Sequence, residues 1–253
     1  MARPLDLEGS RFLVTGAASG IGRATCILIS RLAGKVIAAD IDAEGLECTL
    51  QSIEGEGHIC SPFDLREIEK IPSWMNGLAS EGGVLSGVVH AAGVHCIQPV
   101  RLLTPAVYRN VLTVHTEAAL SLARGFIKKG VCCPKGGSLV FVSSVMAVTG
   151  SPGAVAYALS KAALIGLVKS LAVEVASRRI RANCVVPGFV NSPMFDKVSA
   201  LWDPEQRARV EAEHPLGIGD PEDVANAIAF LLADSGKWIT GTALVVDGGY
   251  TAH

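Results

Sequence analysis

The stretch "RFLVTGAASGIGRATCILIS" (residues 11–30) decides the fold class. An apolar run passes directly into a turn that carries Gly16, Gly20 and Gly22, and a segment of helical period follows the turn. Glycines are needed where backbone approaches a pyrophosphate closely and where a helix packs tightly on the preceding strand. The N–H groups at the start of the helix also attract phosphate charge. The order of strand, glycine turn and helix therefore predicts a dinucleotide-binding turn.

Short apolar runs alternate with longer segments of helical period along the rest of the chain. The strand–helix pairs are KVIAAD with AEGLECTLQSIEG, LSGVVHAAG with PAVYRNVLTVHTEAALSLARGFIKKG, GSLVFVSS with a helix from about 157 to 178, and IRANCVVPG with PEDVANAIAFLLAD, before a closing strand, TALVVDGG. This alternation predicts about seven strands in one parallel sheet with helices on both faces. Because the sequence contains no internal repeat and no linker, we expect residues 1–253 to form a single α/β domain.

The composition favours a protein that handles small molecules. The formal net charge is −2 and the pI is about 6.3, with Lys and Arg scattered along the chain, which argues against nucleic acid or a membrane as a partner. The sequence has no apolar stretch of about 18 residues and no signal-peptide pattern, so we expect a cytoplasmic protein. The seven cysteines include no C-x-x-C pair, so we expect reduced thiols and no metal site.

An acidic residue, Asp40, ends the second predicted strand, about 20 residues after the glycine turn, as a dinucleotide fold requires. Its carboxylate would accept hydrogen bonds from the adenosine ribose hydroxyls and repel a 2′-phosphate, which favours NAD over NADP. The alternative is a helix cap, since DIDAEG could begin the next helix. Asp64, in SPFDLRE, could likewise receive the adenine amino group.

Tyr157 and Lys161, in YALSK, are four residues apart and so lie on one face of the predicted helix. A phenol has a pKa of about 10, but a nearby ammonium and an oxidised nicotinamide would both favour the phenolate. Tyr157 could then exchange a proton with a substrate hydroxyl. Ser144, at the end of LVFVSS, would hold the substrate oxygen by a hydrogen bond. The alternative is a harmless Tyr and Lys on a solvated helix face.

A polar segment, residues 191–219, follows directly on a strand end and carries Trp202. Ligands bind beyond the carboxyl ends of the strands in an open α/β sheet, so we expect a substrate lid over about residues 191–215. The alternative is an ordinary surface excursion. Residues near 94–100 and 145–152 would complete the substrate pocket, and their mixture of apolar and polar groups favours no single substrate class.

The chain closely resembles the short-chain dehydrogenase/reductase family over its whole length. The resemblance rests on TGAASGIG, AAG after the fourth strand, Ser144, Tyr157 with Lys161, PGFVNS after the sixth strand, and ITGTALVVDGG. It implies a doubly wound Rossmann sheet in the order 3-2-1-4-5-6-7, a nicotinamide cofactor, and usually a homotetramer. The implied cofactor contacts are Gly16, Ser19, Gly20, Ile21, Gly22, Asp40, Ile41, Asp64, Leu65, Ala91, Ala92, Gly93, Tyr157, Lys161, Pro187, Gly188 and Val190.

Two histidines depart from the pattern of this family. His90 stands where the family commonly has the first asparagine of NNAG, and we expect it to retain a hydrogen bond that ties neighbouring strands. His115 stands where the family usually places an active-site asparagine that acts through its backbone carbonyl. A histidine there is either a tolerated replacement or a titratable group near pH 6.5 that changes the proton relay.

The leading hypothesis is an NAD-dependent oxidoreductase that interconverts a secondary alcohol and a ketone. Tyr157 would be the general acid/base, Lys161 its electrostatic helper, and Ser144 the substrate anchor. One alternative is a dinucleotide-binding scaffold of the same fold with weakened turnover, and another is a member of the family that modifies carbohydrates or nucleotide sugars. Small residues in the helices near 106–128 and 157–177 allow close packing, either on the sheet or against a partner subunit in a homotetramer or homodimer.

Overall fold

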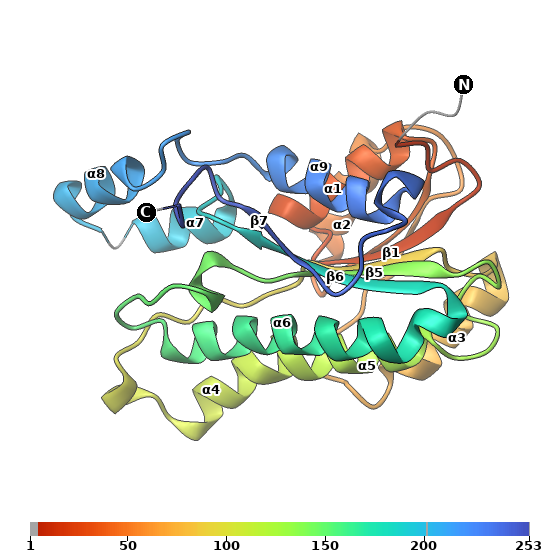
Figure 1. Ribbon diagram of the computed structural model, residues 1–253, viewed down its shortest axis with the longest axis horizontal. Helices are drawn as coiled ribbons and strands as arrows, with labels where there is room; N and C mark the ends of the chain where they lie inside the picture. The colour runs from red at the N-terminus through yellow and green to blue at the C-terminus, as the bar shows by residue number, and fades with distance from the viewer. Residues whose placement is uncertain (1–4, 201, 253) are drawn as a thin grey trace.

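One parallel sheet organises the computed structural model, which describes residues 5–200 and 202–252 (Figure 1). Its seven strands are β1 (Arg11–Thr15), β2 (Lys35–Ala39), β3 (Ile59–Cys60), β4 (Gly87–His90), β5 (Gly137–Val142), β6 (Ile180–Pro187) and β7 (Ala243–Val246). The order across the sheet is β3-β2-β1-β4-β5-β6-β7, and every neighbouring pair is parallel. The predicted doubly wound α/β fold is therefore confirmed.

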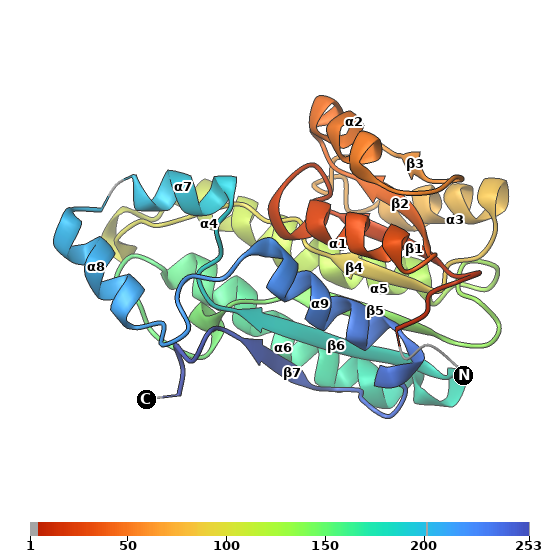
Figure 2. The same ribbon diagram turned by 90° about the horizontal axis from the view of Figure 1, so that it is seen from above.

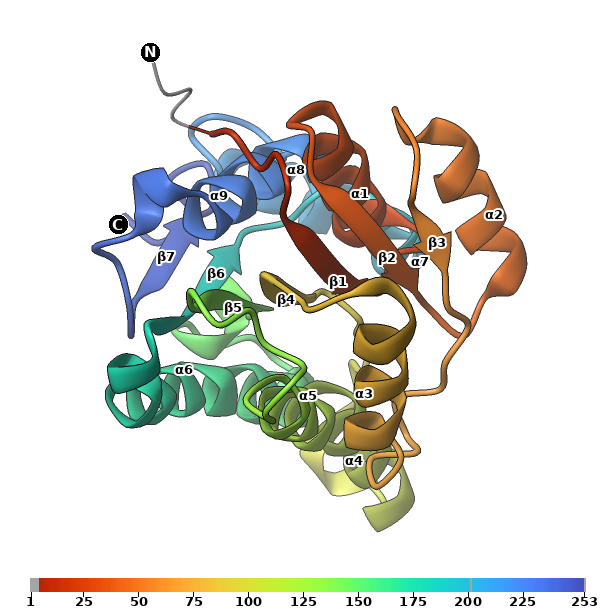
Figure 3. The ribbon, with the colours of Figure 1, turned by 90° about the vertical axis from the view of Figure 1, so that its right-hand side faces the viewer.

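Helices cover both faces of this sheet (Figures 1 and 3). One face carries α1 (Gly20–Arg31), α2 (Ala43–Ser52) and α9 (Pro221–Leu232), and the other carries α3 (Ile71–Gly82), α4 (Pro105–Leu112), α5 (Ala118–Phe126) and α6 (Val155–Val175). Two further helices, α7 (Pro193–Ser199) and α8 (Pro204–Ala212), lie beyond the carboxyl ends of β6 and β7 (Figure 2). No helix among the described residues is long and apolar enough to cross a membrane.

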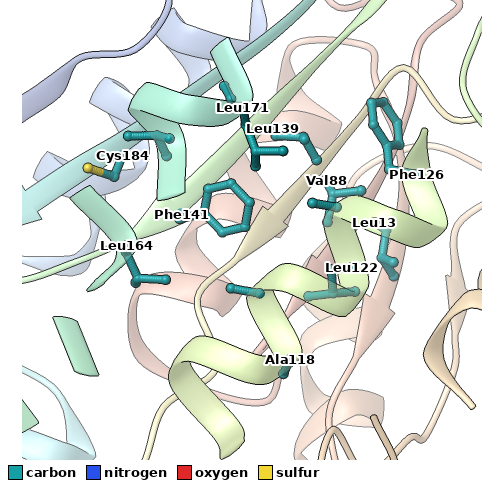
Figure 4. Packing of buried hydrophobic residues seen from close by; sticks show 14 of the residues in the cluster. Leu13, Val88, Ala118, Leu122, Phe126, Leu139, Phe141, Leu164, Leu171 and Cys184 are labelled. Carbon is teal, nitrogen blue, oxygen red and sulfur yellow. The ribbon is translucent and has the colours of Figure 1, made fainter. Parts of the chain in front are cut away.

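The strands are apolar on both faces because helices bury both. In β1, Leu13 joins the cluster under α3, α5 and α6, whereas Phe12 and Val14 join the cluster under α1 and α9, as the two-residue period of a strand requires. Figure 4 shows the first cluster, in which Phe141 of β5 packs near Leu164 of α6. The fixed sheet between these two layers holds the strand ends, and so the loops that follow them, in one place.

The helix expected over about 106–128 runs from Pro105 to Phe126 and contains a π-helical turn. Between α4 and α5 the backbone forms a π-helical turn, Thr113–Glu117, and the N–H of Ala118 donates to the carbonyl oxygen of Thr113, five residues earlier. The expected helix is therefore confirmed, and the π turn within it was not predicted from the sequence. A π turn inserts one residue into an α-helix and is frequent at functional sites, and this one carries His115.

The glycine turn gives a direct test of the packing between α1 and β1. A Cβ on Gly22 would overlap the backbone carbonyl of Gly16, whereas a Cβ on Gly77, in α3, would meet no atom within 4 Å. We expect Gly22→Ala to lower the free energy of unfolding by about 3 kcal/mol, since only backbone could move away. Gly77→Ala is the matched control and should raise it by up to about 1 kcal/mol. Denaturant unfolding of both variants measures the difference, and equal effects would contradict this packing.

Candidate active site

The glycine turn lies against the loop that follows β4. Gly16 has φ +71° and Gly20 has φ +49°, both in the left-handed region that favours glycine. A Cβ on Gly16 would lie 2.5 Å from the backbone nitrogen of Ala92, so only glycine allows this approach. The helix α1 begins at Gly20 without a side-chain cap from Ser19, which leaves its first N–H groups free to bind an anion. The turn therefore fits the phosphates of a dinucleotide.

A cavity of about 910 Å³ opens beside this turn. Thr15, Ala39, Val142 and Pro187, the last residues of four strands, lie in its wall, so the cavity sits at the carboxyl ends of the sheet. The wall contains all the predicted cofactor contacts and Ser144, namely Gly16, Ser19, Gly20, Ile21, Gly22, Asp40, Ile41, Asp64, Leu65, Ala91, Ala92, Gly93, Ser144, Tyr157, Lys161, Pro187, Gly188 and Val190. His115 is fully buried behind the wall.

Asp40 follows β2 directly and faces the cavity. Its Oδ2 accepts a hydrogen bond from the N–H of Ala18 at 3.1 Å, and its Oδ1 accepts one from the N–H of Asp42 at 3.1 Å. The helix cap that the sequence left as an alternative belongs to Asp42, whose Oδ1 accepts from the N–H of Gly45 at 3.0 Å. Asp40 is thus held in place by the glycine turn and keeps lone pairs for a ligand.

Asp64 also lies in the wall, but an arginine engages its carboxylate. The Nε of Arg66 donates to Oδ2 of Asp64 at 2.9 Å, and its Nη2 donates to the same oxygen at 2.6 Å. These hydrogen bonds hold the pKa of the Asp64 carboxyl below its usual range. Arg66 gave no signal in the sequence, because a bidentate pair two residues apart depends on the local turn.

Tyr157, Lys161 and Ser144 meet in the same cavity. The first two project from one face of α6, with Nζ of Lys161 5.7 Å from the centroid of the Tyr157 ring. The ammonium of Lys161 is buried and donates to the carbonyl oxygen of Val142 at 2.9 Å. Ser144 follows β5, and its Oγ accepts a hydrogen bond from the N–H of Met146 at 3.2 Å and lies in the cavity wall with Tyr157. The solvated-face alternative for the Tyr–Lys pair is therefore wrong.

Burial dominates the acidity of this group of side chains. It raises the pKa of Tyr157, and the hydrogen bond with Ser144 opposes that rise. It lowers the pKa of the Lys161 ammonium to about 8. Among the protein groups alone, desolvation of the phenolate is the largest influence on the Tyr157 pKa, and the predicted lowering of this pKa by Lys161 together with an oxidised nicotinamide stays a prediction.

The two unusual histidines are both buried and neutral. His90 Nδ1 lies 2.8 Å from Thr15 Oγ1, which ties β4 to β1 and confirms the expected hydrogen bond between strands. Burial lowers the pKa of His90 to about 3, and burial with the nearby Lys161 holds the pKa of His115 well below 6.5. Burial, and then the charge of Lys161, therefore argue against the hypothesis that His115 titrates near pH 6.5.

The segment predicted as a lid forms α7 and α8 and contributes part of the cavity wall, including Phe195, Val198 and Trp202. Phe189, in the loop after β6, packs edge-on against Phe195 and Trp202 at 6.0 and 5.6 Å between ring centroids. Tyr250 packs on Phe189 from the C-terminal side and also lines the cavity. Tyr250 was not predicted as a site residue. The sequence marks it only by its position directly after DGG.

Comparisons with known proteins agree with this geometry. A family model described as enoyl-(acyl carrier protein) reductase matches residues 16–251. The chain is 34% identical over 249 residues to the 3-oxoacyl-(acyl-carrier-protein) reductase FabG of Thermotoga maritima, and the match covers 97% of this chain and 99% of the relative. The chain belongs to the short-chain dehydrogenase/reductase family. The predicted resemblance is confirmed, and the protein is an oxidoreductase of this family.

Other members of the short-chain dehydrogenase/reductase family show different substrates on the same scaffold. The cis-4-hydroxycyclohexanecarboxylate dehydrogenase of Sinomonas cyclohexanicum is 33% identical over 244 residues, covering 95% of this chain and 96% of the relative. A Beutenbergia cavernae structure, described as an NAD(P)-dependent gluconate 5-dehydrogenase with bound NADP, has a TM-score of 0.92 at 31% identity and covers 99% of this chain and 100% of its own. The fold and the family therefore leave the substrate open.

Proposed function

We propose that this protein is an NAD-dependent dehydrogenase/reductase that interconverts a secondary alcohol and a ketone, with Tyr157 as the general acid/base. The observation that carries the proposal is the meeting of Tyr157, Lys161 and Ser144 in the cavity that also contains the glycine turn. A nicotinamide bound there would accept or supply the hydride. The glycine turn and the N-terminus of α1 would hold its phosphates, and Asp40 its adenosine ribose.

Ser144, Tyr157 and Lys161 have different roles in the proposed proton transfer. Ser144 Oγ holds the substrate oxygen next to the phenol, and Tyr157 takes the hydroxyl proton in oxidation or returns it in reduction. Burial favours the neutral phenol, so Tyr157 is ready as a proton donor in the reduction direction. In the oxidation direction the charge of Lys161, in the same dry pocket, supports the phenolate.

The substrate half of the cavity is lined by apolar side chains together with polar ones, such as Asn110, Gln206 and Arg209, and so fits more than one class of alcohol or ketone. Its wall combines aliphatic side chains from the loops after β4 and β5, such as Val94 and Met146, with aromatic side chains from the lid segment. We propose that α7 and α8 close over this substrate, since they lie at the cavity mouth and carry Phe195 and Trp202 into its wall.

Replacement of the tyrosine tests the proposed chemistry. We expect Tyr157→Phe to lower kcat for NAD-linked oxidation, across a panel of secondary alcohols, by about 100- to 10,000-fold, the usual range for a lost general acid/base. The Kd for NAD, measured by calorimetry, should change less than about threefold, since ring packing is retained. Tyr108→Phe is the control, because Tyr108, on α4, is not among the residues that line the cavity. Turnover retained in Tyr157→Phe, or NAD binding with no turnover in any form, would contradict the proposal.

The preference for NAD over NADP rests on the Asp40 carboxylate. We expect Asp40→Ala to lower the ratio of kcat/KM with NAD to kcat/KM with NADP by about 10- to 100-fold, because charged hydrogen bonds to the ribose and repulsion of a 2′-phosphate disappear together. Asp42→Asn removes a nearby negative charge and keeps the helix cap, so it controls for a general charge effect. An unchanged ratio in Asp40→Ala, or an equal fall in Asp42→Asn, would rule out the ribose role.

We propose that the outward face of α6 forms a subunit contact in a homotetramer or homodimer. Val155, Leu159 and Val173 are 50%, 58% and 82% exposed along one stripe, whereas Ala118 and Ala119 of α5 are fully buried in the chain's own core. We expect a multimer in sedimentation at micromolar concentration and dissociation in Val173→Asp, because a carboxylate would be desolvated in the contact. Leu50→Asp, on α2, controls for an added surface charge. A monomeric wild type would refute the contact.

A further inference from the structure

The loop Ala91–Val94 separates the glycine turn from the helix that carries Tyr157 and Lys161. All four of its residues line the cavity, and Gly16 touches the loop from one side. From the other side, a Cβ on Gly93 would lie 3.0 Å from His115 Nε2 and 3.6 Å from Lys161 Nζ. The loop therefore rests directly on His115, and the position of this imidazole sets how far the loop stands from α6.

His115 connects that loop to α6 through two hydrogen bonds. The N–H of Val94 donates to Nε2 at 2.8 Å, and Nδ1 lies 2.8 Å from the hydroxyl of Ser160. The Ser160 hydroxyl in turn donates to the carbonyl oxygen of Tyr157 at 2.7 Å. His115 and Ser160 are both fully buried, so no water substitutes for these partners.

The direction of these bonds fixes one form of the ring. A backbone N–H can only donate, so Nε2 of His115 must carry a lone pair. The proton of the neutral ring is then on Nδ1, which donates a hydrogen bond to the Ser160 hydroxyl. This hydroxyl in turn donates a hydrogen bond to the backbone carbonyl oxygen of Tyr157. The ring nitrogens of His115 and the Ser160 hydroxyl therefore all have hydrogen-bond partners. A second proton on the ring would face the N–H of Val94.

A second histidine holds the start of the same loop. His90 Nδ1 pairs with the hydroxyl of Thr15, which also lies 3.5 Å from the N–H of Ala92. The other nitrogen, Nε2, faces the carbonyl groups of Val114 and His115 in the π turn but lies outside hydrogen-bonding geometry with either. The loop is thus held at Ala92 through β1 and at Val94 through the π turn.

We propose that His115 is a positioning residue: its neutral imidazole bridges Val94 to Ser160 and so fixes the loop Ala91–Val94 relative to the face of α6 that bears Tyr157 and Lys161. The edge of the ring also meets the Tyr157 ring at 5.5 Å and an interplanar angle of 87°. The titratable groups around it are His90, Lys161 and Tyr157. The inference rests on the proposed function, since it concerns the alignment of the groups that carry out that reaction.

Only histidine reaches both partners from this position. A glutamine side chain ends at about the distance of the ring Nε2 and offers an oxygen to the N–H of Val94, but it loses the bond to Ser160. Phenylalanine keeps the ring packing and loses both bonds. The serine arm is removed separately by Ser160→Ala, which leaves the Nδ1 proton without its acceptor while the bond from the N–H of Val94 to Nε2 remains.

Amide hydrogen exchange and steady-state kinetics together test the bridge. In His115→Phe we expect the Val94 amide to exchange at least about 10-fold faster and kcat to fall about 10-fold, because small displacements of reacting groups lower rates steeply. His115→Gln should restore slow exchange and bring kcat to within about threefold of the wild type. In Ser160→Ala the Val94 amide should exchange faster than in the wild type, and kcat should fall about threefold.

The measurements separate a positioning role from a merely structural one. If the variants lose thermal stability but keep wild-type kcat and wild-type exchange at Val94, the proposal is overturned. It is also overturned if His115→Gln exchanges as fast as His115→Phe. If His115→Phe does not fold, His115→Gln is compared with Ser160→Ala instead. The proposal is then overturned if the Val94 amide exchanges as fast in His115→Gln as in Ser160→Ala. Tyr157→Phe, run in parallel, shows whether turnover depends on the proposed chemistry, and the exchange data test the bridge even where it does not.

Discussion

The buried ammonium of Lys161 constrains the rest of this site. A buried cation is destabilised further by any other positive charge nearby. Burial already lowers the pKa of the Lys161 ammonium to about 8. Around it stand two histidines, a tyrosine and a serine, with a backbone carbonyl as its acceptor at 2.9 Å. A second positive charge here would be repelled with little screening. Burial, and then the charge of Lys161, lower the pKa of both imidazoles and favour their neutral form, and a neutral imidazole offers one hydrogen-bond donor and one acceptor.

The sheet makes this arrangement possible because it brings separate loops to a single edge. β1, β4, β5 and β6 end side by side, so the glycine turn, the Ala91–Val94 loop, Ser144 and the Pro187 loop line one cavity. These four segments are far apart in the sequence. Each loop is fixed at its base by a strand buried on both faces, so small backbone contacts, such as Gly16 on Ala92, hold the cavity shape without large side chains.

The parts of the molecule that follow a short-range rule were predictable from the sequence. The sheet follows from alternating apolar runs, the placement of Tyr157 beside Lys161 from helical spacing, and the phosphate site from the glycine turn. The π turn was not predictable, since it depends on how α4 and α5 pack on their neighbours. For the same reason the sequence left two alternatives for His115, a tolerated replacement and a group that titrates near pH 6.5, whereas the structure encloses its ring between Val94, Ser160 and Tyr157.

The two halves of the cavity are built differently, and this difference explains why one scaffold serves many alcohols and ketones. The half beside α1 and α6 is held by backbone contacts and by buried side chains with few alternative partners, so almost any substitution there disturbs alignment. The half beneath α7 and α8 is formed by aromatic side chains that meet edge-on, such as Phe189 with Trp202. Aromatic walls of this kind tolerate changes in volume and leave the distant proton-transfer groups in place. Under the proposed function, substrate choice would therefore change with the segment of α7 and α8 while Tyr157, Lys161 and Ser144 stay in place.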